Sequence, residues 1–572
     1  MRLCAEKSFC DKLKIMLNSL TYSLPENLLK AVEESLEDWK KTDKISRIWA
    51  KDASVWTNTD EAKWLGWLSS VDVELNDLQK YRDFAEDVKS FESIVLLGMG
   101  GSSLCPEVLA ITFGVENFHI LDSTVPAQVK TLEDKIDLAE TLFIVASKSG
   151  STLEPNCFKQ YFYERVAETV GRENAGKQFV AITDPNSKMQ AVAERDNFRK
   201  IFFGNPEIGG RFSALSPFGI AAMASMQLDF ETFLTNANEM VQSAKSNVPT
   251  ENPAVILGTI LGVAHKFGRD KLTIFTSHEI YDVGAWLEQL IAESTGKNDV
   301  SIIPIDRELI QGDYGDDRIF VYLKLKDSAE NYVIEELEKN SQPVVRIELA
   351  SKENLGQEFF RWEFATAVAG SIMNINPFNQ PDVESAKIEA KELTNAYEET
   401  GSLPAETPFY EENGIKLFSD EANVAELDSL IEEKSLINYL MAHFERIYEN
   451  DYFALLAYIE MNAEHENLLQ ELRHAILDVE GAATCLGFGP RFLHSTGQGY
   501  KGGANNGVFL QITSDDAFDI KVPDQKYTFG VVKAAQARGD FQVLCDRKRR
   551  ALRVHLGENV SEGLNTILSM LL

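Results

Sequence analysis

Short apolar runs alternate with longer stretches of helical spacing over residues 76–235. Runs that are apolar at nearly every position are typical of strands buried on both faces of a parallel sheet. The predicted strands centre near residues 94, 118, 142, 178 and 200. A segment such as 157–170, which lies between two of them, has helical spacing. Strands that alternate with helices predict a doubly wound parallel sheet, with ligands at the carboxyl ends of the strands.

The same alternation resumes over residues 252–400 and predicts a second α/β domain. Its expected strands are 271–277, 300–305, 319–325 and 343–349. An acidic helical stretch at 379–399 then leads into the turn-rich segment 401–408, which predicts a boundary.

The two ends of the chain have different patterns. Residues 1–75 show helical spacing, with a helix expected to open at Pro25, and predict a helical wrapping. Residues 401–572 predict a C-terminal helical and α/β portion, mostly helical over 422–478. Its expected strands are 507–513, 541–545 and 551–556.

Composition and charge narrow the class of protein. The chain of 572 residues is 44% hydrophobic, and no stretch approaches the roughly 18 unbroken apolar residues of a membrane span. A formal net charge of −33 disfavours a nucleic-acid partner, and the basic run 547–550 is expected to be a solvated surface. The six cysteines form no CxxC pair, and the N-terminus is too charged for a signal peptide. We therefore expect a soluble cytoplasmic protein without a membrane or nucleic-acid partner.

Two predicted strands end in small, donor-rich turns that suit a phosphate. Gly98, Gly100 and Gly101 allow close backbone approach to an anion, and Ser102 and Ser103 follow with hydroxyls that can cap the next helix. A second turn runs from Ser147 through Ser149 to Thr152. The first turn lacks the Walker lysine and the third spaced glycine of a dinucleotide fingerprint. On glycine chemistry alone, a tight structural corner stays an alternative.

Three later stretches carry candidate chemistry. Arg211 follows two glycines, so its cation is presented on backbone that can approach a ligand. Glu293 stands beside Ser294, Thr295, Gly296 and Lys297. The stretch 376–387 leaves a strand-like run at 371–375 and enters the helix that carries Glu384 and Lys387. Each stretch can also be interpreted as a capped helix or a surface pair.

Taken together, these motifs resemble those of the glucose-6-phosphate isomerase family, in the order of that family. The resemblance covers roughly residues 90 to 400. It is carried by 98–104 (GMGGSSL), 147–154 (SKSGSTLE), 208–219 (IGGRFSALSPFG), 293–297 (ESTGK) and 378–387 (FNQPDVESAK). The C-terminal stretch 493–503, LHSTGQGYKGG, further resembles the isomerase part of bifunctional transaldolase/glucose-6-phosphate isomerase proteins.

This resemblance implies two sugar isomerase (SIS) domains and the interconversion of glucose 6-phosphate and fructose 6-phosphate through a cis-enediol. It implies Glu293 as the base, Arg211 as the group that stabilises the enediolate, and Lys387 near the ring oxygen. Substrate-binding positions match Gly101, Ser102, Ser147, Ser149, Thr152 and Gln380. No cofactor or metal is implied, and the expected partner is a small sugar phosphate.

One feature departs from the family. A histidine that assists ring opening is expected between the 293–297 and 378–387 motifs, yet no histidine lies from Lys297 to Lys387. The best substitute is His494, because an imidazole that titrates near neutrality can shuttle a proton to the ring oxygen. A satisfied histidine in a structural turn is the alternative. If His494 completes the site, the C-terminal portion folds over it, and a monomer or a homodimer would serve.

Two other functions stay open at this point. One is an isomerase that also acts on mannose 6-phosphate. The other is a non-catalytic SIS-type sensor of sugar phosphates, which would have no use for Glu293, Arg211 and Lys387 together.

Overall fold

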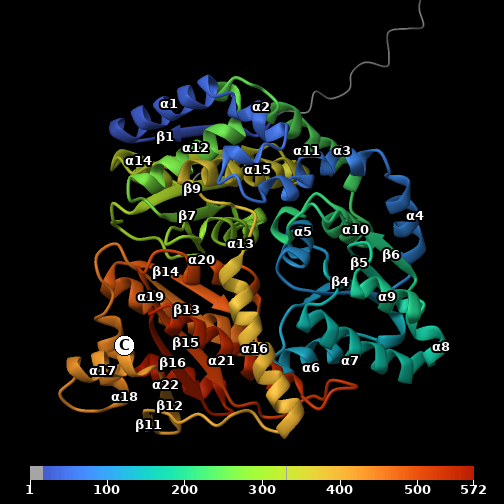
Figure 1. Ribbon diagram of the computed structural model, residues 1–572, viewed down its shortest axis with the longest axis vertical. Coiled ribbons are helices and arrows are strands. Elements are labelled where there is room, and N and C mark those ends of the chain that lie inside the picture. Colours follow the sequence, from blue (N-terminus) through green and yellow to red (C-terminus); the bar gives the residue numbers. More distant parts are fainter. Residues whose placement is uncertain (1–16, 330, 572) are drawn as a thin grey trace, which may run out of the picture.

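Three α/β units, each built on its own sheet, make up the computed structural model, which describes residues 17–329 and 331–571. The first unit lies at the right of Figure 1, the second at the upper left and the C-terminal unit at the lower left. The mixed α/β class with parallel sheets agrees with the prediction, whereas the domain boundaries themselves stay a prediction. No helix of the described residues is long and apolar enough to span a bilayer.

The sheet of the first unit has five parallel strands in the order β3-β2-β4-β5-β6. The strands are β2 (Ser93–Gly98), β3 (Phe118–Leu121), β4 (Thr141–Ala146), β5 (Phe179–Thr183) and β6 (Lys200–Phe203). The helices are α4 (Gln79–Val88), α5 (Leu104–Phe113), α6 (Pro126–Lys135), α7 (Leu153–Val170), α8 (Arg172–Ala175), α9 (Lys188–Arg195), α10 (Pro217–Ser225) and α11 (Phe230–Ala244). Because β2 and β4 are neighbours, with Gly98 opposite Ala146, the loops that follow them lie side by side.

The second unit has the strand order β1-β10-β9-β7-β8, in which only the edge strand β1 is antiparallel. The strands are β1 (Ser19–Ser23), β7 (Lys271–Thr276), β8 (Ile303–Asp306), β9 (Arg318–Leu325) and β10 (Val344–Leu349). The helices are α12 (Pro253–Lys266), α13 (Val283–Thr295), α14 (Tyr332–Lys339) and α15 (Leu355–Met373). Every residue of α15 is buried, so this helix is the centre of the shared core.

The C-terminal unit has a six-stranded sheet in the order β11-β12-β16-β15-β13-β14. The strands are β11 (Tyr410–Glu412), β12 (Ile415–Phe418), β13 (Tyr452–Tyr458), β14 (Ala483–Phe488), β15 (Gly507–Ser514) and β16 (Arg550–Leu556). The helices are α17 (Glu421–Leu430), α18 (Leu436–Phe444), α19 (Ala463–Glu480), α20 (Gly497–Gly502), α21 (Phe529–Asp546) and α22 (Val560–Leu571). Strands β13 to β16 are parallel, and the chain passes from β13 to β14 on one side and then to β15 on the other.

Helices near the N-terminus pack on the first two units. These helices are α1 (Glu26–Lys41), α2 (Lys44–Trp49) and α3 (Ser70–Leu75), with α3 against α11. Helix α1 buries Leu28, Val32, Leu36 and Trp39 along one face, which packs on α12 because apolar residues recur every three or four positions. Residues 1–16, which belong to the predicted wrapping and include the charged N-terminus, lie outside the described residues.

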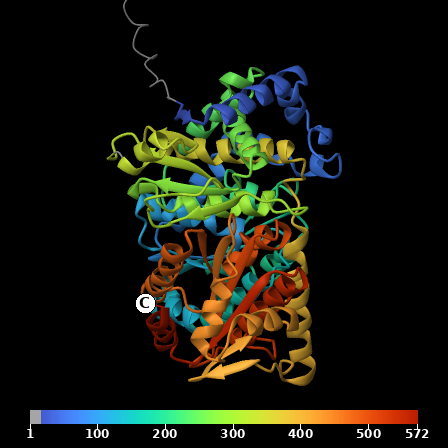
Figure 2. The ribbon, with the colours of Figure 1, turned by 90° about the vertical axis from the view of Figure 1, so that its left-hand side faces the viewer.

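Helix α16 (Pro381–Thr400) connects the second unit to the C-terminal unit. It runs the length of the C-terminal unit in Figures 1 and 2 and packs along α21. Its beginning therefore lies beside the second unit, and its end delivers the chain to β11 and β12.

Most predicted strands are confirmed, and three local predictions are wrong. Residues 541–545 belong to helix α21 and residues 371–375 end helix α15, because both short apolar runs continue a helical pattern that begins earlier. The basic run 547–550 is not uniformly solvated, since Arg549 is 3% exposed and donates to the carbonyl oxygens of Lys501 and Gly503.

Candidate active site

A buried arginine joins the first unit to the second. Arg211, in the short 3₁₀ helix η7 (Gly210–Phe212), is 2% exposed. Its Nε donates to Ser294 Oγ at 2.7 Å, and one terminal nitrogen donates to the carbonyl oxygen of Pro377 at 2.6 Å. The other terminal nitrogen lies 3.2 Å from Glu293 Oε1 and donates to Gln380 Oε1 at 3.1 Å. Burial lowers the pKa of Arg211, and Glu293 opposes that shift.

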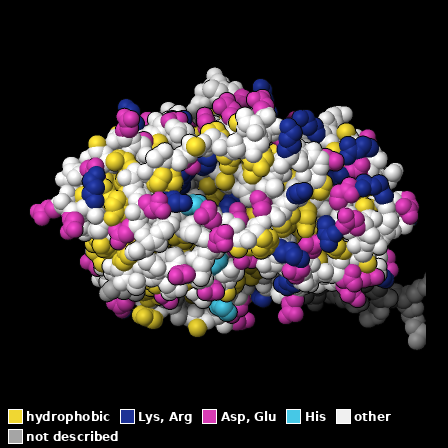
Figure 3. Space-filling view, turned by 90° about the horizontal axis from the view of Figure 1, so that it is seen from below, with side chains coloured by type: hydrophobic (Ala, Val, Ile, Leu, Met, Phe, Trp, Pro, Cys, Tyr) yellow, Lys and Arg dark blue, Asp and Glu magenta, His cyan; other side chains and the backbone are white. Residues whose placement is uncertain are grey.

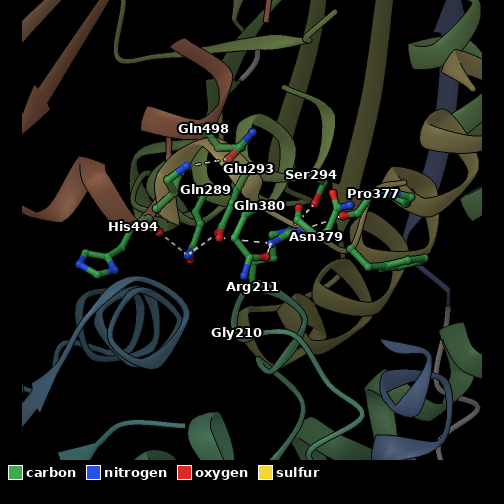
Figure 4. Close-up of polar contacts among 12 residues, drawn as sticks. Gly210, Arg211, Gln289, Glu293, Ser294, Pro377, Asn379, Gln380, His494 and Gln498 are labelled. Atoms are coloured by element: carbon green, nitrogen blue, oxygen red, sulfur yellow. Dashed lines mark hydrogen bonds and ion pairs between the residues drawn. The ribbon is translucent and has the colours of Figure 1, made fainter. Parts of the chain in front are cut away.

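Glu293 lies near the end of α13, where it meets the C-terminal unit. Gln289 Nε2 donates to Glu293 Oε2 at 3.0 Å and to the carbonyl oxygen of His494 at 2.6 Å. Lys297 Nζ donates to the carbonyl oxygens of Glu293 and Ser294, which holds the end of the helix. Figure 4 shows Glu293 and Arg211 facing one another, with the main-chain oxygen of His494 turned toward Gln289 and its imidazole turned away.

Two glycines of the first loop allow these pieces to touch. A Cβ on Gly101 would lie 2.1 Å from the carbonyl oxygen of Gly210, next to Arg211. A Cβ on Gly100, whose φ is +54°, would lie 2.7 Å from the carbonyl oxygen of His494. The sequence predicted that these glycines let the backbone approach a ligand. In the structure they also let the loop after β2 pack closely against the segments that carry Gly210 and His494.

The predicted phosphate-binding residues lie on the adjoining loops after β2 and β4. Ser102 and Ser147 are 8% and 2% exposed, and the Ser147 hydroxyl has no hydrogen-bond partner among the described residues. Ser149 and Ser151 share a hydrogen bond of 2.8 Å. Thr152 stands at the N-terminus of α7, where unpaired N–H groups favour an anion. No capping bond from the side chain of Ser103 to α5 is formed.

His494 belongs to the 3₁₀ helix η11 (Arg491–His494) of the C-terminal unit, and its ring contacts the first unit. Its Nε2 lies 2.8 Å from Glu154 Oε1, in the first turn of α7. Gln536 also donates to Glu154 and accepts a hydrogen bond from Thr124. Burial acts to raise the pKa of Glu154, but the charge and hydrogen bond of His494, together with a backbone hydrogen bond and the charge of Lys387, leave that pKa below its usual value.

The structure does not bring Lys387 into hydrogen-bond contact with the other candidate residues. Its Nζ pairs with Glu384 at 2.8 Å on α16, and its side chain is 40% exposed. It lies close enough to Glu154 to contribute to the lowered pKa of that carboxyl.

Four glutamine and glutamate residues of this region were missed by sequence reasoning. They are Glu154, Gln289, Gln498 and Gln536. Gln498 accepts hydrogen bonds from the backbone N–H groups of Asp382 and Val383, so it caps α16 from the C-terminal unit. Glu154 and Gln498 fall within the quoted motifs 147–154 and 493–503, which could have marked them. Gln289 precedes Glu293 by one helical turn and gives the same hint.

A family model matches the part of the chain that contains Arg211 and Glu293, and several curated relatives match the chain as well. Residues 78–313 match the model described as phosphoglucose isomerase. The chain is 28% identical over 406 residues to the glucose-6-phosphate isomerase of Methanocaldococcus jannaschii, which covers 63% of this chain and 96% of that protein. It is 26% identical to the enzyme of that name from Campylobacter jejuni, over 58% of this chain and 92% of the relative.

Solved structures share the fold. A hypothetical protein of Thermus thermophilus aligns with a TM-score of 0.57 and 24% identity, over 65% of this chain and 99% of the other. A glucose-6-phosphate isomerase of Chlamydia trachomatis aligns with a TM-score of 0.54 and 18% identity, over 66% and 88%. The likeness to these structures shows the fold alone, whereas the family model over residues 78–313 and the curated relatives show that the chain is similar to glucose-6-phosphate isomerases.

Proposed function

We propose that the protein interconverts glucose 6-phosphate and fructose 6-phosphate through a cis-enediol intermediate. The observation that carries this proposal is the buried pair of Glu293 and Arg211, 3.2 Å apart, beside two donor-rich loops of the first unit. The aldose–ketose isomerisation of a sugar phosphate needs three groups: a carboxylate base, a fixed cation and a phosphate-binding site.

Glu293 is the group that moves the proton. It takes the proton from C2 of the open-chain aldose and returns it to C1 of the enediol, so one carboxyl acts first as base and then as acid. Gln289 donates to one carboxylate oxygen and Arg211 lies at the other, which holds the plane of the carboxylate. Arg211 stabilises the negative charge that develops on the enediolate oxygens, because its guanidinium is already fixed by four hydrogen bonds besides its contact with Glu293.

The substrate phosphate is bound by Ser102, Ser147, Ser149 and Thr152, with Gly101 at the closest backbone approach. The unpartnered hydroxyl of Ser147 supports this assignment, because a buried donor gains a hydrogen bond from a phosphate oxygen. A phosphate held here fixes the distance from Glu293 to C1 and C2, so binding energy remote from the reacting atoms contributes to the rate. Gln380 contacts the sugar from the start of α16.

Ring opening is assigned to His494, with Glu154 as its positioning residue. The pairing of His494 Nε2 with a buried carboxylate gives the imidazole a fixed orientation, from which it can pass a proton to the ring oxygen. Lys387, on the neighbouring face of α16, assists near the same oxygen through its charge. Because His494 comes from the same chain, we propose that a monomer holds a complete site, although a homodimer is compatible with it. The four described cysteines are free thiols, as a reducing compartment such as the cytoplasm maintains them.

A coupled assay tests this function. Fructose 6-phosphate is added to the purified chain, and the appearance of glucose 6-phosphate is followed with an excess of a dehydrogenase that consumes it. Turnover that scales with the amount of chain supports the isomerase. If fructose 6-phosphate raises the melting temperature without being converted, the chain is a sensor and the proposal is wrong.

A further inference from the structure

The C-terminal unit has its own topological switch point. From β13 the chain moves to β14 on one side and, after α20, to β15 on the other, so the strand order reverses between β13 and β15. Open parallel sheets bind ligands in the crevice outside the carboxyl ends of such strands. In this unit those ends are Tyr458 and Ser514.

A cavity of about 330 Å³ lies at this place. Tyr458, Thr513 and Ser514 line it from the strand ends, with α21, β12 and the connecting segment 401–409 as the other walls. This volume falls within the usual range for small-molecule sites. The residues of the candidate active site do not line it, so the two regions are separate.

The charged lining of this cavity is mainly cationic. Lys416, Lys533, Arg538 and Arg553 face two carboxylates, Glu406 and Glu411. The chain as a whole carries a formal charge of −33, so a cavity with this balance differs from its surroundings. Acidic and basic side chains are interspersed on the end of the molecule where β11 and β12 lie, which Figure 3 views from below. Local cations, not the overall charge, would attract an anion here.

Glu406 holds both arginines. One carboxylate oxygen lies 2.8 Å from Arg553 and the other lies 3.0 Å from Arg538. Arg553 is fixed further by the ring of Phe418, 4.3 Å from its guanidinium carbon. Glu406 itself is exposed and belongs to the segment 401–409, which has no helix or strand. The carboxylate of Glu406, which belongs to an exposed connecting segment, therefore occupies a binding position formed by Arg538 and Arg553.

Two further polar groups of the cavity have no partner. Lys416 Nζ forms no ion pair or side-chain hydrogen bond with the described residues. The Tyr458 hydroxyl is fully buried and has no partner among the described residues. Lys533, by contrast, is held by the carbonyl oxygen of Ser514 at 3.0 Å and by Asp516 at 2.6 Å. Lys416 is half-buried, so its unpaired charge is available to a ligand. The Tyr458 hydroxyl is a buried donor, which gains by acquiring an acceptor.

We propose that this cavity is a second ligand site, which binds a small phosphorylated metabolite. Its phosphoryl group takes the place of the Glu406 carboxylate on Arg538 and Arg553, because paired guanidinium groups match phosphate oxygens as well as carboxylate oxygens. Lys416 supplies the third cation. The proposal is independent of the isomerase activity, because none of these residues lies in the active site.

Equilibrium dialysis with radiolabelled inorganic phosphate tests the proposal on the full chain. We expect Glu406→Gln to bind two equivalents of phosphate, one at the loops after β2 and β4 and one in this cavity. Removal of the competing carboxylate should tighten the second equivalent about tenfold over the wild type, which corresponds to about 1.4 kcal/mol. Adding Arg538→Gln or Lys416→Gln to that variant should weaken the second equivalent about tenfold or abolish it.

Lys434→Gln, a surface lysine of the same unit that pairs with Asp428, is the matched control and should leave both equivalents unchanged. All of these variants should keep the isomerase turnover of the wild type, which also shows that they fold. A single equivalent in Glu406→Gln, or a second one that is insensitive to both Arg538→Gln and Lys416→Gln, would overturn the proposal.

Discussion

Replacing Glu154 with glutamine should impair ring opening and spare the proton transfer between C1 and C2. The carboxylate is 3% exposed, contacts His494 Nε2 at 2.8 Å and has a pKa below its usual value. Glutamine keeps the size and one hydrogen-bonding oxygen but removes the charged oxygen that the imidazole contacts. His494 is then held less firmly in place for proton transfer to the ring oxygen, although Glu293, Gln289 and Arg211 are untouched.

The size of the effect follows from the kind of bond that is lost. A buried hydrogen bond to a charged group contributes roughly 1.5–3 kcal/mol. If this energy favours the ring-opening transition state, kcat/KM for ring-closed substrate should fall about 10- to 100-fold. The loss should fall on ring opening and not on proton transfer, because the Glu154 carboxylate contacts the imidazole of His494 and not Glu293.

The assay compares two substrates. Fructose 6-phosphate is mostly ring-closed, whereas its 5-deoxy analogue cannot close a ring because the C5 hydroxyl is missing. Conversion of each is followed by NMR in D₂O, which also reports exchange at C1. Glu154→Gln should slow the first substrate and leave the second within about twofold. Equal losses on both substrates would refute the assignment of His494 and Glu154 to ring opening. Glu133→Gln, which removes a carboxylate paired with Arg165 elsewhere in the same unit, is the control.

Two other predictions concern packing and pH. Gly101→Ala should strongly reduce both activity and melting temperature, because the new Cβ would lie 2.1 Å from the carbonyl oxygen of Gly210. The control Gly210→Ala should be tolerated, because its Cβ would meet no atom within 4 Å. Similar melting temperatures for the two variants would contradict the close approach. Burial and a nearby carboxylate raise the pKa of Glu288 from 4.5 to about 8, so the folded chain keeps a proton that the unfolded chain has released, and stability should fall as pH rises through that window. As pH rises over this range, the melting temperature of Glu288→Gln should fall by a few °C less than that of the wild type. The exposed control Glu279→Gln should follow the wild type. Identical pH profiles for Glu288→Gln and the wild type would exclude the raised pKa of Glu288.

Much of the fold could be predicted from the sequence, because both SIS-type sheets are built from strands that are apolar at nearly every position. The nine predicted parallel strands of these two sheets all coincide with observed ones. The edge strand β1 was missed, since the exposed run Ser19–Ser23 has no apolar pattern. Short apolar segments were harder: Phe541 to Cys545 looks like a strand locally, but the longer pattern of α21 decides.

The C-terminal sheet was predicted less well for a physical reason. Strand β13, Tyr452–Tyr458, is buried on both faces and shows no alternation, so it could not be told from the helical pattern around it. Its pairing with β14 and β15 is set by contacts between segments some 30 to 60 residues apart, which no local pattern encodes.

The sequence motifs located the candidate site, but the contacts among its residues could not be inferred from them. Sequence resemblance pointed to Glu293 and Arg211, which the structure places 3.2 Å apart. The contacts of His494 with Glu154 and Gln289 depend on how the C-terminal unit folds back, with the partners 340 and 205 residues away along the chain. Lys387, to which the same resemblance pointed, pairs with Glu384 at the surface of α16.

The central claim is that Glu293 carries the proton between C2 and C1, and one measurement tests it most directly. The coupled assay of fructose 6-phosphate is run on the wild type, on Glu293→Gln and on the exposed control Glu335→Gln, and exchange of the C1 proton with D₂O is recorded alongside. We expect Glu293→Gln to lose both isomerisation and exchange by a factor of about 10² to 10⁴, with the control unchanged. Isomerisation or exchange at the wild-type rate in Glu293→Gln would contradict the account and move the base to another residue.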